Sequence, residues 1–252
     1  MNDYTSFADL YDLFYEDFTE DIELYLGFAE RTGGSILEIG SGTGRVALAL
    51  ADEGHTVVGL EISEAMRAVA QRKADRAQLA DRMEFIAGDM RRFQLDRHFG
   101  SIIVPLNTFL HNLTLDDQLA TLACCKKHLR PGGLLVIDCF NPDPAHAEDD
   151  RRLIVQRTIT DRDTGQTALL MLSRATDWNQ QLQEITYLID RSDQTGLVQR
   201  AVLHTSFRFI FRHEMQLLLK AGGFDLKDVY GSYALDPFDA GSDKLIAVAT
   251  PA

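Results

Sequence analysis

The stretch ILEIGSGTGR, residues 36–45, joins a short apolar run to three closely spaced glycines and an arginine. An apolar run that enters such a turn and continues as a helical pattern predicts a buried strand that turns sharply into a helix. In a parallel sheet this turn lies where ligands bind, because the free N–H groups of the helix face the ligand. The stretch therefore predicts an α/β fold with a ligand site at the turn.

Strand and helix patterns alternate around this turn. Helical patterns are expected at residues 21–31, 44–54, 63–79 and 116–129, and buried strand patterns at residues 35–40, 56–61, 83–89, 101–107 and 134–140. This alternation predicts a mostly parallel sheet with helices on both faces. Pro131-Gly132-Gly133 predicts a sharp turn into the last of these strands.

A different pattern begins after Pro144. Long runs with partial alternation are joined by turn-like segments, at residues 152–160, 167–177, 183–191 and 197–211. They predict an antiparallel β layer inserted into the α/β fold. The chain then returns to a helix at residues 213–223 and to strands at residues 224–231 and 244–250. His213 and Glu214 are expected to be a first-turn helix pair without a chemical role.

Composition narrows the classes of protein to consider. The chain has 252 residues, of which 45% are hydrophobic, and this suits one large domain or a domain with an insertion. A net charge of -13 opposes nucleic-acid binding, which rests on Lys and Arg. No signal peptide or membrane span is recognisable, so a cytoplasmic protein is expected. Cys124, Cys125 and Cys139 lack disulfide or metal spacing and are expected to be reduced core thiols.

The spacing of the glycines separates two classes of cofactor. Dinucleotide folds use Gly-x-Gly-x-x-Gly, whereas Gly40, Gly42 and Gly44 form Gly-x-Gly-x-Gly, so the fingerprint of NAD-binding proteins is not met. Glu61 follows about twenty residues later at the end of the second strand, where a carboxylate meets a ribose diol. A helix-capping box from Glu61 to Glu64 is the alternative, and it leaves a carboxylate at a buried strand end unexplained.

At these positions the sequence resembles the class I S-adenosylmethionine-dependent methyltransferases, from about Tyr11 to the C-terminus. ILEIGSGTGR resembles the first motif of that family, VVGLEIS carries Glu61, AGDM carries Asp89, and LRPGGLLVID resembles the segment that leads into the fifth strand. The resemblance implies a Rossmann-like methyltransferase fold with a seven-stranded sheet. It also implies S-adenosylmethionine as the methyl donor and S-adenosylhomocysteine as the product.

In that family the glycine turn lies against the methionine part of the cofactor. The residue matched by Glu61 binds both ribose hydroxyls, and the residue matched by Asp89 accepts from the adenine amino group. Asp89 could instead cap a loop, and Met66, expected over the adenine face, could be a core residue. The cofactor-binding candidates are Tyr11, Tyr15, Gly40, Ser41, Gly42, Gly44, Arg45, Glu61, Ile62, Met66, Asp89, Met90, Leu106 and Asn107.

Aromatic residues recur at helical spacing near the N-terminus, at Tyr4, Phe7, Tyr11, Phe14, Tyr15 and Phe18. One interpretation is an amphipathic helix that only packs on the domain. The run also resembles the N-terminal segment of small-molecule methyltransferases, in which a tyrosine at the position of Tyr11 contacts the cofactor and the substrate. We therefore expect a lid helix within residues 1–20, with Tyr11 as a catalytic candidate.

The stretch SIIVPLNTFLHN, residues 101–112, concerns the methyl acceptor. Amide methylases of nucleic acids and proteins end the fourth strand in [DNS]-P-P-[YFW], and this chain departs from that pattern. It is more similar to the N-methyltransferases of aminosugar nucleotides, in which a histidine at the place of His111 faces the substrate. With a pKa near neutrality, His111 would accept a proton from the acceptor. The alternative is that His111 caps the following turn.

The inserted layer, residues 146–211, extends this resemblance. It implies a substrate wall and a homodimer contact, next to a cofactor-binding core of residues 21–145 and 212–252. Candidates for lining the wall are Arg174, Tyr187, His204 and Arg208, although charged residues on a half-exposed sheet are usually only solvated.

The sequence thus predicts an enzyme that transfers a methyl group from S-adenosylmethionine to a small molecule. An amine is favoured as acceptor, with a hydroxyl or a carboxylate as alternatives. No cluster of His, Asp and Glu has metal-ligand spacing, so no metal is expected. Two other functions stay open: another reaction with the same cofactor, and a cofactor sensor without catalysis.

Overall fold

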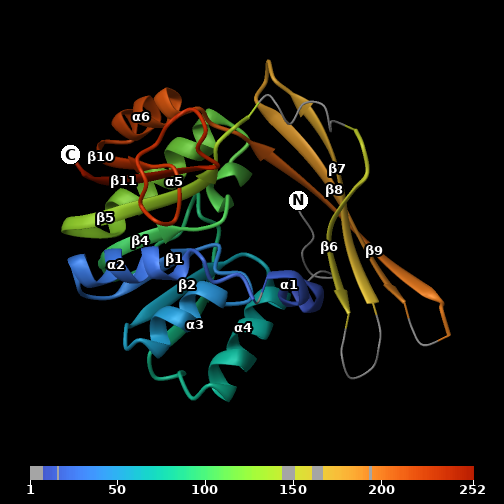
Figure 1. The fold of residues 1–252 in the computed structure, drawn as a ribbon. Coiled ribbons are helices and arrows are strands. Elements are labelled where there is room, and N and C mark those ends of the chain that lie inside the picture. Colours follow the sequence, from blue (N-terminus) through green and yellow to red (C-terminus); the bar gives the residue numbers. More distant parts are fainter. Residues whose placement is uncertain (1–7, 16, 144–150, 161–166, 193–194) are drawn as a thin grey trace.

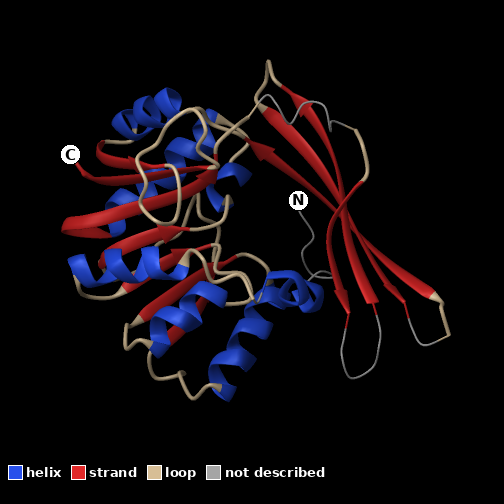
Figure 2. Cartoon of the chain, in the orientation of Figure 1, coloured by secondary structure: helices blue, strands red, loops and turns tan. Residues whose placement is uncertain are grey.

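The computed structural model of the chain describes residues 8–15, 17–143, 151–160, 167–192 and 195–252. It has two sheets that stand opposite each other, one of them covered by helices (Figures 1 and 2). The helices are α1 (Ala8–Tyr15), α2 (Ile22–Thr32), α3 (Arg45–Asp52), α4 (Glu64–Arg76), η1 (Thr108–His111), α5 (Leu115–His128) and α6 (Arg212–Ala221). The strands are β1 (Ile36–Ile39), β2 (Val57–Glu61), β3 (Met83–Ala87), β4 (Phe99–Val104), β5 (Leu129–Phe140), β6 (Ile154–Thr160), β7 (Thr167–Asp177), β8 (Leu182–Ser192), β9 (Val198–Arg208), β10 (Phe224–Tyr230) and β11 (Lys244–Pro251).

The larger sheet has seven strands in the order β10-β11-β5-β4-β1-β2-β3. The pairs among β1 to β5 are parallel, whereas β11 runs antiparallel to both β5 and β10. The expected Rossmann-like sheet is therefore confirmed. Because β1 is central, the turn after it and the ends of its neighbours meet at one edge of the sheet.

Alternate residues of the central strands pack on opposite faces of this sheet. Ile36 of β1 packs with residues of α2 and α3, whereas Leu37 and Ile39 pack on the other face with residues of α5 and α6. Both groups are fully buried. This is why the strand sequences are nearly continuous apolar runs, as in sheets that helices cover on both faces.

One sequence expectation about the large sheet is wrong. Pro131-Gly132-Gly133 does not precede the fifth strand, because β5 already begins at Leu129. These residues form an irregularity inside the strand, where the pairing with β4 shifts and Gly132 has a φ of 76°. A glycine tolerates this conformation, so the strand resumes its ladder afterwards.

The smaller sheet confirms the inserted antiparallel layer. Its order is β6-β7-β8-β9, and every neighbouring pair is antiparallel. It stands across from the C-terminal edge of the parallel strands, with α1 between α4 and β6 (Figure 1). Of the predicted N-terminal aromatics, Tyr4 and Phe7 lie outside the described residues.

The three cysteines are free, and Cys125 and Cys139 are buried as expected for core thiols, whereas Cys124 is only half-buried. Within the described ranges, no group of His, Cys, Asp and Glu residues is arranged to hold a metal ion. None of the helices found there combines the length and the apolar character that crossing a membrane would need.

A buried ion pair fixes the start of α2 against the start of α3. The guanidinium of Arg45 donates to both carboxylate oxygens of Asp21 at 2.6 Å and to the carbonyl of Phe18 at 2.5 Å. The side chain of Asp21 is inaccessible to solvent and that of Arg45 is 8% exposed. A paired and fully bonded charge is tolerated in such a place, whereas a single charge is not.

We predict that Arg45→Met lowers the free energy of unfolding by about 3–5 kcal/mol, because it leaves the Asp21 carboxylate buried without its partner. Chemical denaturation measures this change. The double variant Arg45→Met/Asp21→Asn is expected to lose less than the sum of the single variants, and the exposed Arg76→Met serves as control. Additive losses would show that the two side chains do not stabilise each other.

Candidate functional site at the glycine turn

Most of the predicted residues surround one cavity of about 740 Å³, here termed the glycine-turn cavity. It lies at the C-terminal ends of β1, β2, β3 and β4, and residues of α1, β8 and β9 complete its wall. The predicted residues that line it are Tyr11, Tyr15, Gly40, Ser41, Gly42, Arg45, Glu61, Ile62, Met66, Asp89, Met90, Leu106, Asn107 and His111. The structure thus brings them together, while their individual roles stay predictions.

Gly44 is the one cofactor-binding candidate that does not line this cavity. It caps the N-terminus of α3 with a φ of 84°, and a side chain there would come within 3.2 Å of Ala70 and Phe85. The third glycine therefore allows the helix to start and to pack closely on its neighbours. Gly40 has a comparable constraint at the cavity itself, where a side chain would meet Thr108 of η1 at 2.4 Å.

Glu61 ends β2 and links the glycine turn to the start of α4. Its carboxylate accepts from the backbone N–H of Gly42 at 3.0 Å and from that of Ser63 at 2.8 Å. Burial raises the pKa of Glu61, and the two backbone donors oppose that shift. The side chain of Ser63 caps α4 by accepting from the Met66 N–H, and the carboxylate of Glu61 lines the cavity while it accepts from the two backbone donors.

Glu38 in β1 is a cavity residue that the sequence analysis did not single out. Its side chain is buried, and its Oε2 atom has no hydrogen-bond partner among the described residues. Burial raises the pKa of Glu38 to about 8, although the positive charge of Arg45 opposes the shift. A buried acceptor without a donor is unfavourable, so this oxygen is suited to a cationic or hydrogen-bond-donating ligand group.

Asp89 follows β3, but arginine side chains already engage its carboxylate. Arg91 donates to it at 2.7 Å and 2.9 Å, and Arg92 lies at 3.4 Å. The hydrogen bond from the Arg91 side chain lowers the pKa of Asp89. Arg91 also reaches Asp117 of α5 at 3.2 Å, and both line the cavity. The sequence did not predict these contacts of Arg91 with Asp89 and Asp117.

Arg45 lines the cavity, but its guanidinium is held by Asp21 and Phe18. Its effect on the site is therefore that of a fixed positive charge near Glu38, whose pKa it lowers. A direct bond from Arg45 to a cofactor would require it to leave a bidentate, buried partner.

Helix α1 is fastened to the glycine turn by Asp12. The hydroxyl of Thr43 donates to Asp12 at 2.5 Å, and the ammonium of Lys73 lies 2.9 Å from the same carboxylate. Tyr11 and Tyr15 stack with ring centroids 4.6 Å apart, and both line the cavity. The expected N-terminal helix thus closes one side of the site.

His111 ends η1 and lies on the four-stranded sheet, with its ring 4.7 Å from that of Phe207. Burial lowers the pKa of His111 to about 4, and a hydrogen bond with the Ser206 backbone opposes the shift. The expectation of a pKa near neutrality is therefore wrong, because the second sheet covers the ring. A neutral imidazole binds by hydrogen bonding and is a weak base.

The turn between β4 and η1 has an unusual backbone. Leu106 and Asn107 both have positive φ, 45° and 66°. The buried carboxylate of Asp138 accepts from the Leu106 N–H at 3.1 Å, and the Asp138 carbonyl accepts from the Asn107 N–H at 2.9 Å. Since left-handed backbone is costly outside glycine, these bonds hold a conformation that the local sequence would not choose.

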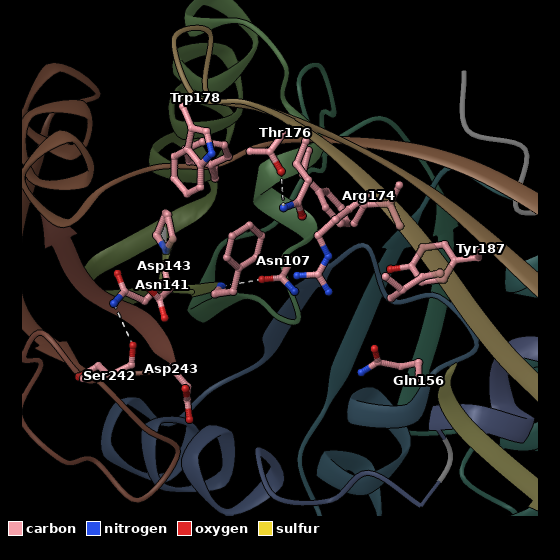
Figure 3. A pocket seen from close by; sticks show the side chains of 18 of the residues that line it. Asn107, Asn141, Asp143, Gln156, Arg174, Thr176, Trp178, Tyr187, Ser242 and Asp243 are labelled. Carbon is pink, nitrogen blue, oxygen red and sulfur yellow. Dashed lines mark hydrogen bonds between the residues drawn. The ribbon is translucent and has the colours of Figure 1, made fainter. Parts of the chain in front are cut away.

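A second cavity of about 450 Å³, the inter-sheet cavity, lies between the four-stranded sheet and the ends of β5 and β11 (Figure 3). Both cavities share Tyr15, Asn107, Tyr187 and Phe207 in their walls, so they meet at these residues. Of the candidates for the inserted layer, Arg174 and Tyr187 line the inter-sheet cavity.

The other two candidates of the inserted layer line neither cavity. His204 is exposed and hydrogen-bonds to Thr186 on the outer face, while Arg208 reaches the carbonyl of Leu113 at 3.4 Å. Strand alternation accounts for the outward position of His204, because its neighbour Leu203 faces inward.

Comparisons with known proteins agree on one family. A family model described as a methyltransferase domain matches residues 36–133. The cypemycin N-terminal methyltransferase of a Streptomyces species is 28% identical over 219 residues, which cover 86% of this chain and 82% of that protein.

Solved structures share the fold. An S-adenosylmethionine-dependent methyltransferase from Clostridium acetobutylicum aligns with a TM-score of 0.82 at 15% identity, covering 98% of each chain. CalS10 from Micromonospora echinaspora, an amino pentose methyltransferase with bound S-adenosylmethionine, aligns with a TM-score of 0.74 at 20% identity, covering 96% of this chain and 97% of that chain.

The raised pKa of Glu38 gives a prediction about stability. The pKa of Glu38 is 4.5 in the unfolded chain and about 8 in the folded chain. At a pH between these two values, the folded chain therefore binds more protons at this site than the unfolded chain. Stability therefore falls as pH rises through that window. We expect Glu38→Gln to be about as stable as the wild type near pH 5 and more stable by about 2–4 kcal/mol at pH 8 and above.

Thermal and chemical unfolding between these pH values measure the difference, and the exposed Glu64→Gln is the control. A constant difference between Glu38→Gln and wild type would mean that Glu38 is ionised throughout.

Proposed function

We propose that this chain is a class I S-adenosylmethionine-dependent methyltransferase that transfers the methyl group to an amine of a small molecule, and the matched methyltransferase domain and the related methyltransferase support this. The observation that carries the proposal is that two cavities adjoin and share four wall residues. The glycine-turn cavity has a size suited to a nucleoside cofactor, and the inter-sheet cavity offers separate room for an acceptor.

The residues of the glycine-turn cavity fit the cofactor. The unpartnered oxygen of Glu38 suits the ammonium group of its methionine part, because that group supplies the charge and donors that the oxygen lacks. Glu61 suits the ribose hydroxyls at the end of β2, and Met66 and Ile62 offer apolar contact to the adenine. When bound, S-adenosylmethionine supplies an activated methyl group on a sulfonium.

Methyl transfer to a neutral amine requires little acid–base catalysis from the residues of the chain. A neutral amine uses its lone pair to form the new N–C bond, the C–S bond breaks, and its electron pair stays on the sulfur of S-adenosylhomocysteine. The resulting ammonium then loses a proton to water. We infer that Tyr11, Tyr15 and α1 exclude water and align the reactants, which is the main source of rate for such a displacement.

An amine is favoured over other acceptors for two reasons. Asp143 and Asp243 stand in the inter-sheet cavity, where they attract an amine in its ammonium form. The relatives also include proteins named for N-terminal and amino pentose methylation. Hydroxyl and carboxylate acceptors remain the alternatives to be tested.

We further propose the division into a lid at residues 1–20, a core at 21–145 and 212–252, and a substrate wall at 146–211. A cytoplasmic location and a homodimer contact on the wall belong to the same proposal. Exposed apolar side chains on the outer face, at Val155, Val198 and Val202, support such a contact. Sedimentation of the purified chain tests it.

Product analysis with labelled methyl donor and a panel of amines tests the function. Formation of S-adenosylhomocysteine together with a methylated amine supports it, and EDTA should leave the rate unchanged. A cofactor sensor would leave the donor intact, and another reaction would give a different nucleoside product.

We predict that Glu61→Ala weakens binding of S-adenosylhomocysteine by about 1.5–3 kcal/mol, the scale of hydrogen bonds to a charged group. Calorimetry measures the affinity, and the exposed Glu64→Ala is the matched control. Circular dichroism checks that the variant folds, since Glu61 also binds the Gly42 N–H. Unchanged affinity in a folded variant would remove the ribose assignment, and NAD is expected not to bind.

For His111 we predict a positioning role. Since its pKa is lowered to about 4, the ring is neutral at working pH and holds an N–H of the acceptor by hydrogen bonding. His111→Ala should lower kcat by about 10–100-fold with little change in cofactor affinity. His111→Gln, which retains hydrogen-bonding groups, should recover part of the rate.

The pH profile of kcat separates positioning from base catalysis. We expect wild type and His111→Gln to have the same profile near neutrality. An inflection near neutral pH that disappears in the variant would identify His111 as a general base, and wild-type turnover in His111→Ala would exclude it from the reaction.

A further inference from the structure

The inter-sheet cavity has two walls of different character (Figure 3). One wall is the inner face of the four-stranded sheet, with Arg174 near its centre on β7. The other consists of the end of β5 and the segment 240–243 before β11. The charged residues on that second wall, Asp143 and Asp243, are exposed to solvent.

Among the residues that the structure describes, Arg174 has no counter-charge. Its Nε–H is buried and has no hydrogen-bond partner, and no ion pair joins its guanidinium to any part of the chain that the structure describes. Its strand neighbours on the same face are Leu172 and Thr176, which cannot neutralise it. Keeping a guanidinium half-buried and unpaired is unfavourable, so the position suits a ligand that supplies acceptors.

Asn107 presents a second donor to the same space. Its Oδ1 atom accepts from the backbone N–H of Phe140 at 2.6 Å, and this bond fixes which way the amide is turned. The amide NH₂ therefore points the other way, and Figure 3 shows it and the Arg174 side chain pointing toward one another. Two donors face each other with no acceptor between them among the described residues.

We propose that Arg174 and Asn107 bind an anionic oxygen group of the methyl acceptor, a carboxylate or a phosphate. This inference rests on the proposed function and names its substrate class: an amine that carries an acidic group. A planar guanidinium and an amide NH₂ together offer the forked donors that carboxylates and phosphates accept. Asn107 lines both cavities, so the anion lies close to the amine that is methylated.

The carboxylates of the opposite wall are compatible with this assignment. Asp143 and Asp243 are exposed, so water and salt screen their repulsion of an anion bound at Arg174. The same screening leaves only a weak attraction for the ammonium end of the same molecule. The cavity is therefore bipolar, and it matches an acceptor that carries both signs of charge.

The chain contains a built-in reporter for this site. Trp178 is its only tryptophan, it lines the inter-sheet cavity, and it packs edge-on against Phe209 at 5.1 Å. We would titrate the protein, saturated with S-adenosylhomocysteine, with acetate, inorganic phosphate and neutral acetamide at constant ionic strength. The fluorescence of Trp178 reports binding without any need for the true acceptor.

A saturable change with acetate or phosphate, and none with acetamide, is the expected result. Arg174→Gln should weaken this binding by roughly tenfold or more. Arg174→Lys should weaken it less, because lysine keeps the positive charge but lacks the forked N–H donors of the guanidinium. Arg208→Gln should bind as the wild type does, since Arg208 also has a buried unpartnered Nε but lines neither cavity. Whichever of the two anions binds more tightly identifies the acidic group.

Three outcomes would overturn the inference: no saturable binding of either anion, equal binding by Arg174→Gln and wild type, or equal binding of acetamide and acetate. Cofactor binding is measured on the same preparations by calorimetry. Loss of S-adenosylhomocysteine binding would count against the proposed function, whereas the anion titration repeated on the free protein reports on Arg174 independently.

Discussion

The structure depends on one backbone constraint, the left-handed conformation of the glycine turn after β1. Gly40 and Gly44 have φ values of 70° and 84°, which residues with side chains adopt only at a cost. The missing side chain of Gly40 lets Thr108 approach, and this places η1, and with it His111, beside the turn. The same turn exposes the Gly42 N–H to Glu61 and the Thr43 hydroxyl to Asp12. A few residues of backbone thus bring a strand end, helix α1 and a short helix together around one cavity.

A second element, the carboxylate of Asp138, extends this order to the junction of the two cavities. It is fully buried and accepts from the hydroxyls of Tyr25 at 3.2 Å and Tyr233 at 2.9 Å, while Lys244 lies at 3.3 Å. With this many donors the charge is tolerated inside the protein. Its bond to the Leu106 N–H then stabilises the left-handed turn that directs Asn107 to the junction of the two cavities. The glycine turn and the Asp138 network are therefore complementary: one orders the glycine-turn cavity and the other its junction with the inter-sheet cavity.

The sequence predicts much of the fold because its signals are local. Apolar runs, turn residues and the spacing between Gly42 and Glu61 follow from strand length and helix geometry, and the strands and most helices lie where these patterns place them. The missing information concerns contacts between distant segments. The pKa of His111 depends on burial beneath β9, and the partners of Arg45 lie about twenty-five residues away. Glu38 lies inside the quoted motif, yet only its burial without a donor reveals that it is available to a ligand.

The charges of the glycine-turn cavity bear on how the proposed reaction would gain its rate. Glu38 and Glu61 line that cavity, and the ammonium group and ribose that they are proposed to bind are the same before and after methyl transfer. Their contacts would therefore contribute to binding of donor and product alike, and they would not lower the barrier of the chemical step. On the proposed function, the rate then comes from geometry, from helix α1 held by Asp12 and from an acceptor aligned at the junction of the two cavities. This division explains why the lid and the left-handed turn at Asn107 are both anchored by buried or half-buried polar contacts, whereas no strong base faces the junction within the described residues.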